Sequence, residues 1–212
     1  MKKLNLLLLV FFAAFIVSKT VGQGITGSKH DFSGQTAWNP SGEICIVCHT
    51  PHNADATIAD APLWNHATTT FDYTSFIYTS NTLNAVVGVP DGSSKLCLSC
   101  HDGTVAVDNF GGVTTGTNFI GTINPNASLG TNLKNDHPIS FNYDAAQALD
   151  NEIRVSATET PSPATGTITQ VYLMNGQVQC GSCHDVHNST GVPKLLKVAN
   201  TKSQLCLDCH VK

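Results

Sequence analysis

The chain is poor in charged residues. Asp, Glu, Lys and Arg make up only 12% of its 212 residues, and the formal net charge is −4. A typical soluble domain has about 25% charged residues. Nucleic acids and anionic lipid surfaces are bound mainly through clusters of Lys and Arg, and no such cluster is present. The composition therefore gives no reason to expect nucleic acid or a lipid surface as a partner.

Long apolar segments are also scarce. One apolar run, interrupted only by Asn5, extends over residues 4–17 and follows Lys2 and Lys3. It is shorter than the roughly 20 residues that a membrane-spanning helix needs. The basic start, apolar core and small residues that follow predict a secretory signal peptide over residues 1–22. An uncleaved N-terminal anchor is the alternative. We expect an exported protein with one domain over residues 23–212 and no membrane span after signal removal.

The cysteines follow a single pattern. All eight fall in four copies of C-x-x-C-H, at Cys45–His49, Cys97–His101, Cys180–His184 and Cys206–His210, called here the first to fourth motifs. C-x-x-C-H is the attachment motif of haem c. The thiols bind the haem vinyl groups and the adjacent histidine is the proximal iron ligand. The sequence thus predicts four covalently attached haem c groups. The thioether residues are Cys45, Cys48, Cys97, Cys100, Cys180, Cys183, Cys206 and Cys209, and the proximal ligands are His49, His101, His184 and His210.

Two other uses of paired cysteines are less consistent with this pattern. A zinc ribbon needs C-x-x-C pairs but does not require a histidine after each pair. Disulfides suit an oxidising compartment, but they too leave the four histidines unexplained. Haem attachment is the interpretation that uses every residue of the repeated motif.

Methionine is nearly absent, which bears on the second axial ligand. The two methionines are Met1, which would leave with the signal peptide, and Met174. Methionine is a common axial ligand of cytochromes c, but here histidine is far more abundant. His/His ligation is therefore expected at each iron, an arrangement suited to electron transfer. Five histidines lie outside the motifs and are the candidate distal ligands: His30, His52, His66, His137 and His187.

Helical periodicity is weak along the whole chain. A short strand is expected within residues 71–90, a loop over residues 103–135, and an exposed excursion or hairpin over residues 155–171. Short helices are expected near the motifs, especially over residues 203–210. The predicted fold class is mostly irregular coil with short helices and few short strands, wrapped around a stack of haem groups that serves as the core.

Several segments together resemble a known family. GSKHDFSG, CIVCHTPHNA, APLWNH, CLSCHDGTVAVD, NDHPISF, CGSCHDVHN and CLDCH are similar to the doubled-CXXCH multihaem cytochromes c, and most similar to the OmcE-type extracellular tetrahaem cytochromes that polymerise into filaments. This resemblance implies a continuous stack of bis-histidine haems. It also implies that His30 serves the first haem and that His52 ligates a haem of the adjacent subunit.

Three functions follow as hypotheses. The first is the subunit of an extracellular conductive filament, a homopolymer that passes electrons to redox partner proteins or extracellular acceptors. The second is a discrete periplasmic tetrahaem electron carrier. The third is a haem enzyme such as a nitrite or hydroxylamine converter, which requires an iron with an open position. Because histidines outnumber the irons, we expect an electron-transfer protein and not an enzyme.

Overall fold

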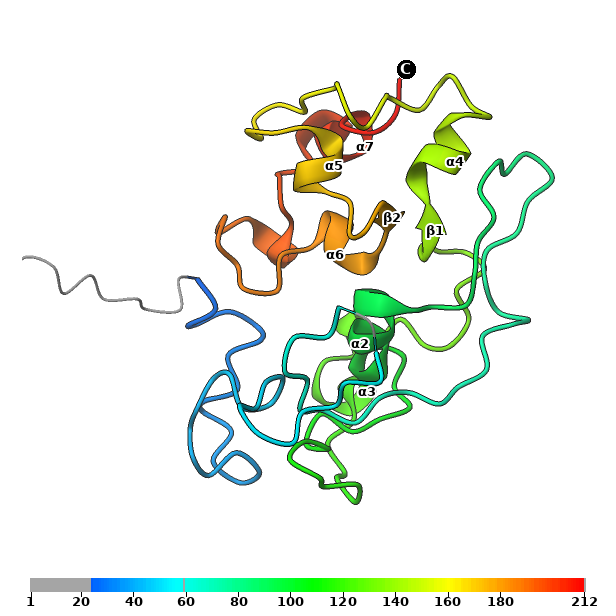
Figure 1. The fold of residues 1–212 in the computed structure, drawn as a ribbon. Coiled ribbons are helices and arrows are strands. Elements are labelled where there is room, and N and C mark those ends of the chain that lie inside the picture. Colours follow the sequence, from blue (N-terminus) through cyan, green and yellow to red (C-terminus); the bar gives the residue numbers. More distant parts are fainter. Residues whose placement is uncertain (1–23, 59, 212) are drawn as a thin grey trace, which may run out of the picture.

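The computed structural model describes residues 24–58 and 60–211 (Figure 1). The predicted signal peptide, residues 1–22, lies outside the described residues, so the domain boundary at Gly22 stays a prediction. None of the helices in the described residues has the length and apolar character needed to cross a membrane.

Regular structure is sparse and short, as the sequence predicts. Among the described residues the longest helix, α2, has 10 residues, and the two strands found there pair antiparallel with Phe141 opposite Val178. The described elements are α2 (Gly92–His101), α3 (Ile120–Ile123), η1 (Pro125–Ala127), β1 (Phe141–Asn142), α4 (Tyr143–Gln147), α5 (Ile168–Val171), β2 (Gln177–Val178), α6 (Cys180–Cys183), η2 (Pro193–Leu195), η3 (Thr201–Ser203) and α7 (Gln204–Leu207). The predicted fold class, mostly coil with short helices and few short strands, is confirmed.

Some local expectations were wrong. No strand forms within residues 71–90, which are turns and irregular backbone that ends at the start of α2. The stretch 103–135 is mostly loop, as expected, but contains α3 and η1. Residues 155–171 form a mostly exposed excursion, one of the two expected alternatives, which ends in helix α5. The other alternative, a hairpin, does not form there. A Thr167–Gln170 capping box starts α5, a local signal that stabilises a helix end. The helix expected over residues 203–210 is present as α7.

Among the described residues, most buried apolar side chains gather in two small clusters and not in one continuous core. One cluster lies around α4, α5 and the strands and consists of Phe141, Tyr143, Ala146, Ile168, Tyr172 and Val178. The other joins α2 to two loops through Tyr73, Leu98 and Leu133. Such small clusters bury little apolar surface for a chain of this length. The fold therefore depends heavily on the segments that surround the four motifs.

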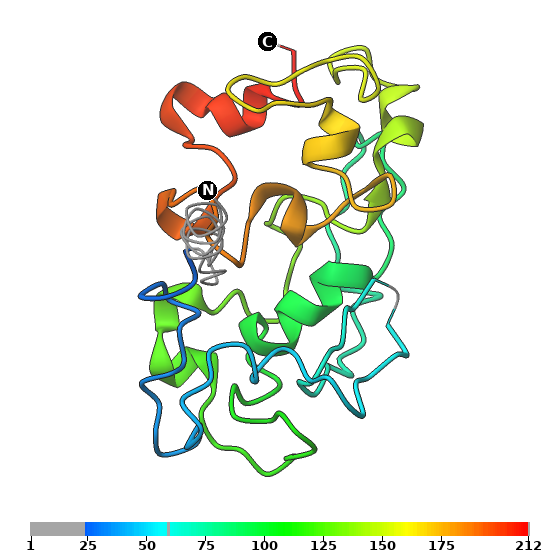
Figure 2. The ribbon, with the colours of Figure 1, turned by 60° about the vertical axis from the view of Figure 1, so that its left-hand side comes forward.

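The motifs follow one another along the long dimension of the molecule. Helices α2, α6 and α7 contain residues of the second, third and fourth motifs, and they succeed one another in this order in both views (Figures 1 and 2). The first motif belongs to the blue N-terminal part, which begins beside the loop after the third motif and extends to the end opposite to α7. The fold thus arranges the second, third and fourth motifs in sequence order, and the first motif lies on the side of the second.

Candidate metal centres

The first motif is held by a short antiparallel backbone contact. His49 bridges Trp64, and the N–H of Thr50 donates to the carbonyl of Leu63 at 2.9 Å. Nδ1 of His49 lies 2.7 Å from the carbonyl oxygen of Pro62. The 62–64 segment therefore fixes both the backbone and the ring of the first proximal histidine.

The third motif repeats this arrangement with an unrelated segment. His184 bridges Leu196, and the N–H of Asp185 donates to the carbonyl of Leu195 at 2.7 Å. Nδ1 of His184 lies 3.0 Å from the carbonyl oxygen of Lys194. In both motifs the ring nitrogen reaches the carbonyl two residues before the bridging residue.

The second motif uses helix α2 and the η1 turn instead of a bridge. The N–H of Leu129 donates to the carbonyl of His101 at 2.8 Å. Nδ1 of His101 lies 2.7 Å from the carbonyl oxygen of Ala127. The turn after α3 therefore holds the backbone and the ring of His101, as residues 62–64 hold those of His49.

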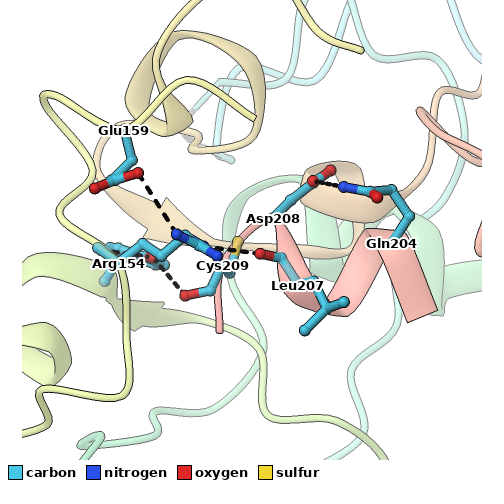
Figure 3. A network of polar contacts seen from close by, with 7 residues as sticks. Arg154, Glu159, Gln204, Leu207, Asp208 and Cys209 are labelled. Carbon is cyan, nitrogen blue, oxygen red and sulfur yellow. Dashed lines mark hydrogen bonds and ion pairs between the residues drawn. The ribbon is translucent and has the colours of Figure 1, made fainter. Parts of the chain in front are cut away.

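The fourth motif, Cys206–His210, is anchored by Arg154 (Figure 3). The backbone N–H of Arg154 donates to the carbonyl of Cys209 at 2.9 Å, and its Nε donates to the carbonyl of Leu207 at 2.9 Å. The ion pair of Arg154 with Glu159 is long, at 3.6 Å, and partly exposed, so it contributes little. Arg154 therefore holds the motif mainly through backbone carbonyls.

The carbonyl contacts decide which ring nitrogen is available to a metal. A carbonyl oxygen only accepts hydrogen bonds, so Nδ1 of His49, His101 and His184 must carry the proton. Nε2 then has its lone pair free. A histidine whose other ring N–H is fixed by a carbonyl is the usual form of a metal-bound imidazole.

Three of the proximal histidines have a second histidine ring close by. The ring centroids lie 6.2 Å apart for His49 and His187, 6.0 Å for His101 and His30, and 6.4 Å for His210 and His137. Metal–imidazole bonds are about 2.0 Å long, so two imidazoles on opposite sides of one metal have centroids roughly 6.3 Å apart. The observed spacings are those that two imidazoles would have if both held one iron from opposite sides.

The remaining histidines differ sharply in exposure. His52 and His184 are exposed, and among the described residues no other histidine ring is paired with either of them at this spacing. His66 is buried, with 3% of its surface exposed. Its Nδ1 and Nε2 lie 2.7 Å and 3.2 Å from the carbonyl oxygens of Ala67 and Val107. Of the five predicted distal ligands, the fold thus brings three to a proximal ring. His66 lies against the second motif instead, with its Nε2 3.6 Å from Sγ of Cys100, and His52 stays apart.

His30 reaches the second motif because the N-terminal segment docks on the third. Its ring bonds the carbonyl of Val186, and Nδ2 of Asn188 donates to the carbonyl of Gly24 at 2.7 Å. Burial, followed by the nearby rings of His101 and His184, lowers the pKa of His30 to about 4. The ring is therefore neutral at neutral pH, the form that binds metals. The resemblance led us to expect His30 at the first haem, but its nearest proximal ring is His101 of the second motif.

The second and third motifs are in direct contact through their first cysteines. The Cys97 thiol donates a hydrogen bond to Cys180, which raises the pKa of Cys97 and lowers that of Cys180. The N–H of Cys180 in turn donates to Oγ of Ser94 in α2 at 2.9 Å. These two attachment sites are therefore adjacent.

The other neighbouring motifs are linked by weaker electrostatic effects between thiols. Burial, followed by Cys48, raises the pKa of Cys100 to about 12. Burial, followed by Cys183, raises the pKa of Cys209 to about 11. First and second motifs, and third and fourth motifs, are thus close neighbours, so the four motifs form one unbroken series.

The residues of these sites fit covalent haem better than an all-protein metal site. All eight cysteines are free of disulfides. Within residues 24–58 and 60–211 there is no group of three or more His, Cys, Asp or Glu side chains placed to hold a metal ion. A haem iron takes only two ligands from the protein, and paired histidines are what the fold provides. Met174 does not compete, because its Sδ accepts a hydrogen bond from Oγ of Ser93 at 3.0 Å.

Comparison with known proteins agrees with this chemistry. Residues 173–212, which include the third and fourth motifs, match the doubled CXXCH motif family. No curated protein matches the chain. The family match supports a multihaem c-type cytochrome that acts in electron transfer, with covalently bound haem c.

Sequence reasoning did not find the residues that hold the motifs in place. The carbonyls of Pro62, Ala127 and Lys194 act through the backbone, which carries no side-chain signal. Their positions relative to the motifs also differ, at 13 residues after His49, 26 after His101 and 10 after His184. Only the fold brings them to the rings.

Proposed function

We propose that the chain binds four haem c groups and carries electrons as the subunit of an OmcE-type extracellular filament. When bound, haem c supplies a one-electron Fe(III)/Fe(II) couple. The chain's own residues attach, orient and separate these groups. The unbroken series of four motifs supports this function, because electrons can then pass from one attachment site to the next.

Three axial pairs are proposed within the chain: His49 with His187, His101 with His30, and His210 with His137. They are supported by the ring spacings of 6.0 to 6.4 Å. Nδ1 of His137 donates to the carbonyl of Pro138 at 2.8 Å, which leaves its Nε2 free for iron. Filling both axial positions with imidazole favours electron transfer over substrate binding.

The fourth pair is proposed to form between subunits. His184 has an exposed ring, and among the described residues no histidine ring lies at the 6.0 to 6.4 Å spacing from it. His30 is near it but makes its ring contact with His101. The missing ring contact at His184 is the observation that carries the filament proposal. His52 is exposed as well, and its backbone is fixed by the Thr50 hydroxyl, which donates to the His52 carbonyl at 2.9 Å. We assign His52 as the ligand of the His184 iron in the adjacent subunit. An iron–imidazole bond across each interface would link haem loading to polymerisation.

His66 is proposed to be structural. Its ring is buried in the protein without any haem, between the carbonyls of Ala67 and Val107 and the Cys100 thiol of the second motif, whose Sγ lies 3.6 Å from Nε2. Among the described residues no proximal histidine ring is paired with it. A neutral imidazole has one donor and one acceptor nitrogen, so both are satisfied when Nδ1 donates to the Ala67 carbonyl and Nε2 accepts from the Cys100 thiol. A satisfied buried histidine stabilises the segments that it joins. Here it connects the segment after Trp64 to residue Val107, which lies 41 residues away.

The test compares His52→Ala with His66→Gln in the exported protein. We expect His52→Ala to keep four haems per chain by intact mass, to lose filaments in negative-stain micrographs, and to gain one high-spin iron. His66→Gln should keep filaments and low-spin spectra. Normal filaments from His52→Ala would overturn the assignment.

A discrete periplasmic carrier is the alternative, and the same exposed His184 ring bears on it. As a monomer, the chain would leave the iron at His184 with one ligand from the described residues, and that open position would also permit a haem enzyme. Wild-type protein that stays monomeric and binds carbon monoxide at one iron in four would favour these alternatives over the filament.

A further inference from the structure

A buried polar network joins the second motif to the third. It does not orient the histidine of either motif, because those rings are held by the carbonyls of Ala127 and Lys194. Its centre is Gln179, which precedes Cys180 and is 4% exposed. Nε2 of Gln179 donates to Oδ1 of Asp91 at 2.7 Å, and Oε1 accepts from Oγ of Ser140 at 3.1 Å. Asp91 directly precedes α2, so one side chain connects the beginnings of α2 and α6.

The network is closed and leaves little freedom. The N–H of Asp91 donates to Oγ of Ser140 at 3.1 Å, which completes a ring of three residues with Gln179. Ser94 adds a second link, because it accepts from the N–H of Cys180 and is fully buried. A fully satisfied buried network fixes one arrangement of the elements that it joins.

The Asp91 side chain binds Gln179 and does not cap its own helix, α2. It is the N-cap of α2, a position where an aspartate normally accepts a hydrogen bond from its own helix. Here the side chain makes no such bond and binds Gln179 instead. Gly92, the next residue, has φ +44°, a left-handed conformation that favours glycine, and packs beside the Gln179 amide.

We propose that Gln179, together with Asp91, Ser94 and Ser140, is a positioning residue that sets the separation and angle of the second and third haem groups. This inference rests on the proposed function, because it concerns electron transfer between two of the four haems. Electron tunnelling falls steeply with the distance between the two redox centres. The rings of His101 and His184 are oriented by the carbonyls of Ala127 and Lys194. Gln179 therefore acts on the relative placement of the two sites and not on iron ligation.

The experiment uses the dispersed holoprotein and measures the excitonic couplet of the Soret band by circular dichroism. This couplet reports the distance and angle between neighbouring haems. We expect Gln179→Leu to keep four haems and low-spin spectra but to lose part of the couplet, and to slow electron exchange after rapid photoreduction. Gln35→Leu is the matched control, because Gln35 is exposed.

Exchanging the amide and the carboxylate between Gln179 and Asp91 separates an effect on haem placement from a general loss of stability. Gln179→Glu keeps the acceptor for Ser140 but places a carboxylate against Asp91, so the couplet should fall. Adding Asp91→Asn restores a donor to this contact, and the couplet should recover. If Gln179→Leu does not fold, Ser94→Ala removes only the link to Cys180 and should give a smaller loss.

An unchanged couplet in folded Gln179→Leu, Gln179→Glu and Ser94→Ala would overturn the inference. Failure of the filament proposal would be seen differently, as monomeric wild-type protein in micrographs. Fewer than four haems by mass would contradict the tetrahaem count. Both of these outcomes are measured on the wild-type protein and are independent of whether the couplet changes in the Gln179 variants.

Discussion

The imidazole planes of His49 and His187 are nearly parallel, with an angle of 17° between them. Those of His137 and His210 are close to perpendicular, at 72°. Parallel axial imidazoles split the energies of two iron d orbitals, whereas perpendicular imidazoles leave them nearly equal. We therefore predict two kinds of low-spin signal in the electron paramagnetic resonance spectrum, a rhombic signal from the first haem and a large-gmax signal from the fourth.

His187→Ala tests this assignment. The variant should keep four haems by mass, lose the rhombic component and retain the large-gmax component. His137→Ala is the reciprocal variant and should have the opposite effect. Loss of the same component from both variants would contradict the pairing.

A second prediction concerns Tyr172, whose hydroxyl donates to the carboxylate of Asp208 within the fourth motif. Asp208 is 2% exposed, so Tyr172→Phe leaves a buried carboxylate with only the Gln204 amide as its side-chain donor. Leaving a buried polar group without a partner costs about 1–3 kcal/mol. We expect Tyr172→Phe to lower the free energy of unfolding by this amount in denaturant titrations of the holoprotein.

Tyr78→Phe is the control for Tyr172→Phe, because Tyr78 is only half-buried. Its loss of stability should be within about 0.5 kcal/mol, the range of ordinary surface substitutions. Equal effects of the two variants would show that the Asp208 contact contributes nothing particular.

Some of the site could be predicted because it depends on covalent spacing. The interval from Cys45 to His49 is sufficient to place two thiols and one imidazole around a haem, whatever the rest of the fold. The scarcity of regular structure also follows from the sequence, since weak periodicity and many Gly, Thr and Asn residues leave the backbone without a preferred helix or sheet.

The partners of the motifs could not be predicted, because they depend on long-range contacts. His187 lies 138 residues after His49, and nothing in the local sequence of either residue specifies their approach. Gln179 reaches Asp91 across 88 residues. The strand expected within residues 71–90 was wrong for a related reason. This segment packs Tyr73 against α2 and directs its hydroxyl to Asp102 at 2.6 Å, and tertiary contacts of this kind override a weak alternating pattern.

A third prediction concerns the opening of the loop 106–118 at low pH. Partial burial alone would raise the pKa of Asp108, but hydrogen bonds from Asn118 and Thr117 outweigh it, and the pKa is lowered. A lowered pKa stabilises the fold above the ordinary carboxyl value of about 3.9, and this contribution is lost as the pH falls through the lowered value. The loop should therefore open in acid and stay closed at neutral pH.

Amide hydrogen exchange at Thr117 and Asn118 measures this opening. Asp108→Asn should raise exchange there at neutral pH, because the amide side chain is a weaker acceptor than the carboxylate. Asp136→Asn makes the same chemical change outside this loop, at a half-buried residue, and should leave exchange in this loop unchanged. Wild-type exchange rates in Asp108→Asn would contradict the prediction.

The last prediction concerns the docking of the N-terminal segment that brings His30 to the second motif. Gly24 has φ +96°, and a Cβ at this position would lie 1.9 Å from the carbonyl oxygen of Asn188. Gly24→Ala must therefore displace the segment from the Asn188 loop. Since this contact is six residues before His30, we expect weaker ligation of the second iron. In some of the molecules the second iron, which is one of the four, should become high-spin and bind carbon monoxide.

Gly34→Ala is the control, because a Cβ at Gly34 has no atom within 4 Å and the backbone is not left-handed there. It should keep the low-spin spectrum of the wild type. N-terminal sequencing of both variants would verify that signal cleavage is unchanged, so that a spectral difference arises from docking alone. An entirely low-spin Gly24→Ala protein that fails to bind carbon monoxide would show that His30 reaches its iron without the Gly24–Asn188 contact.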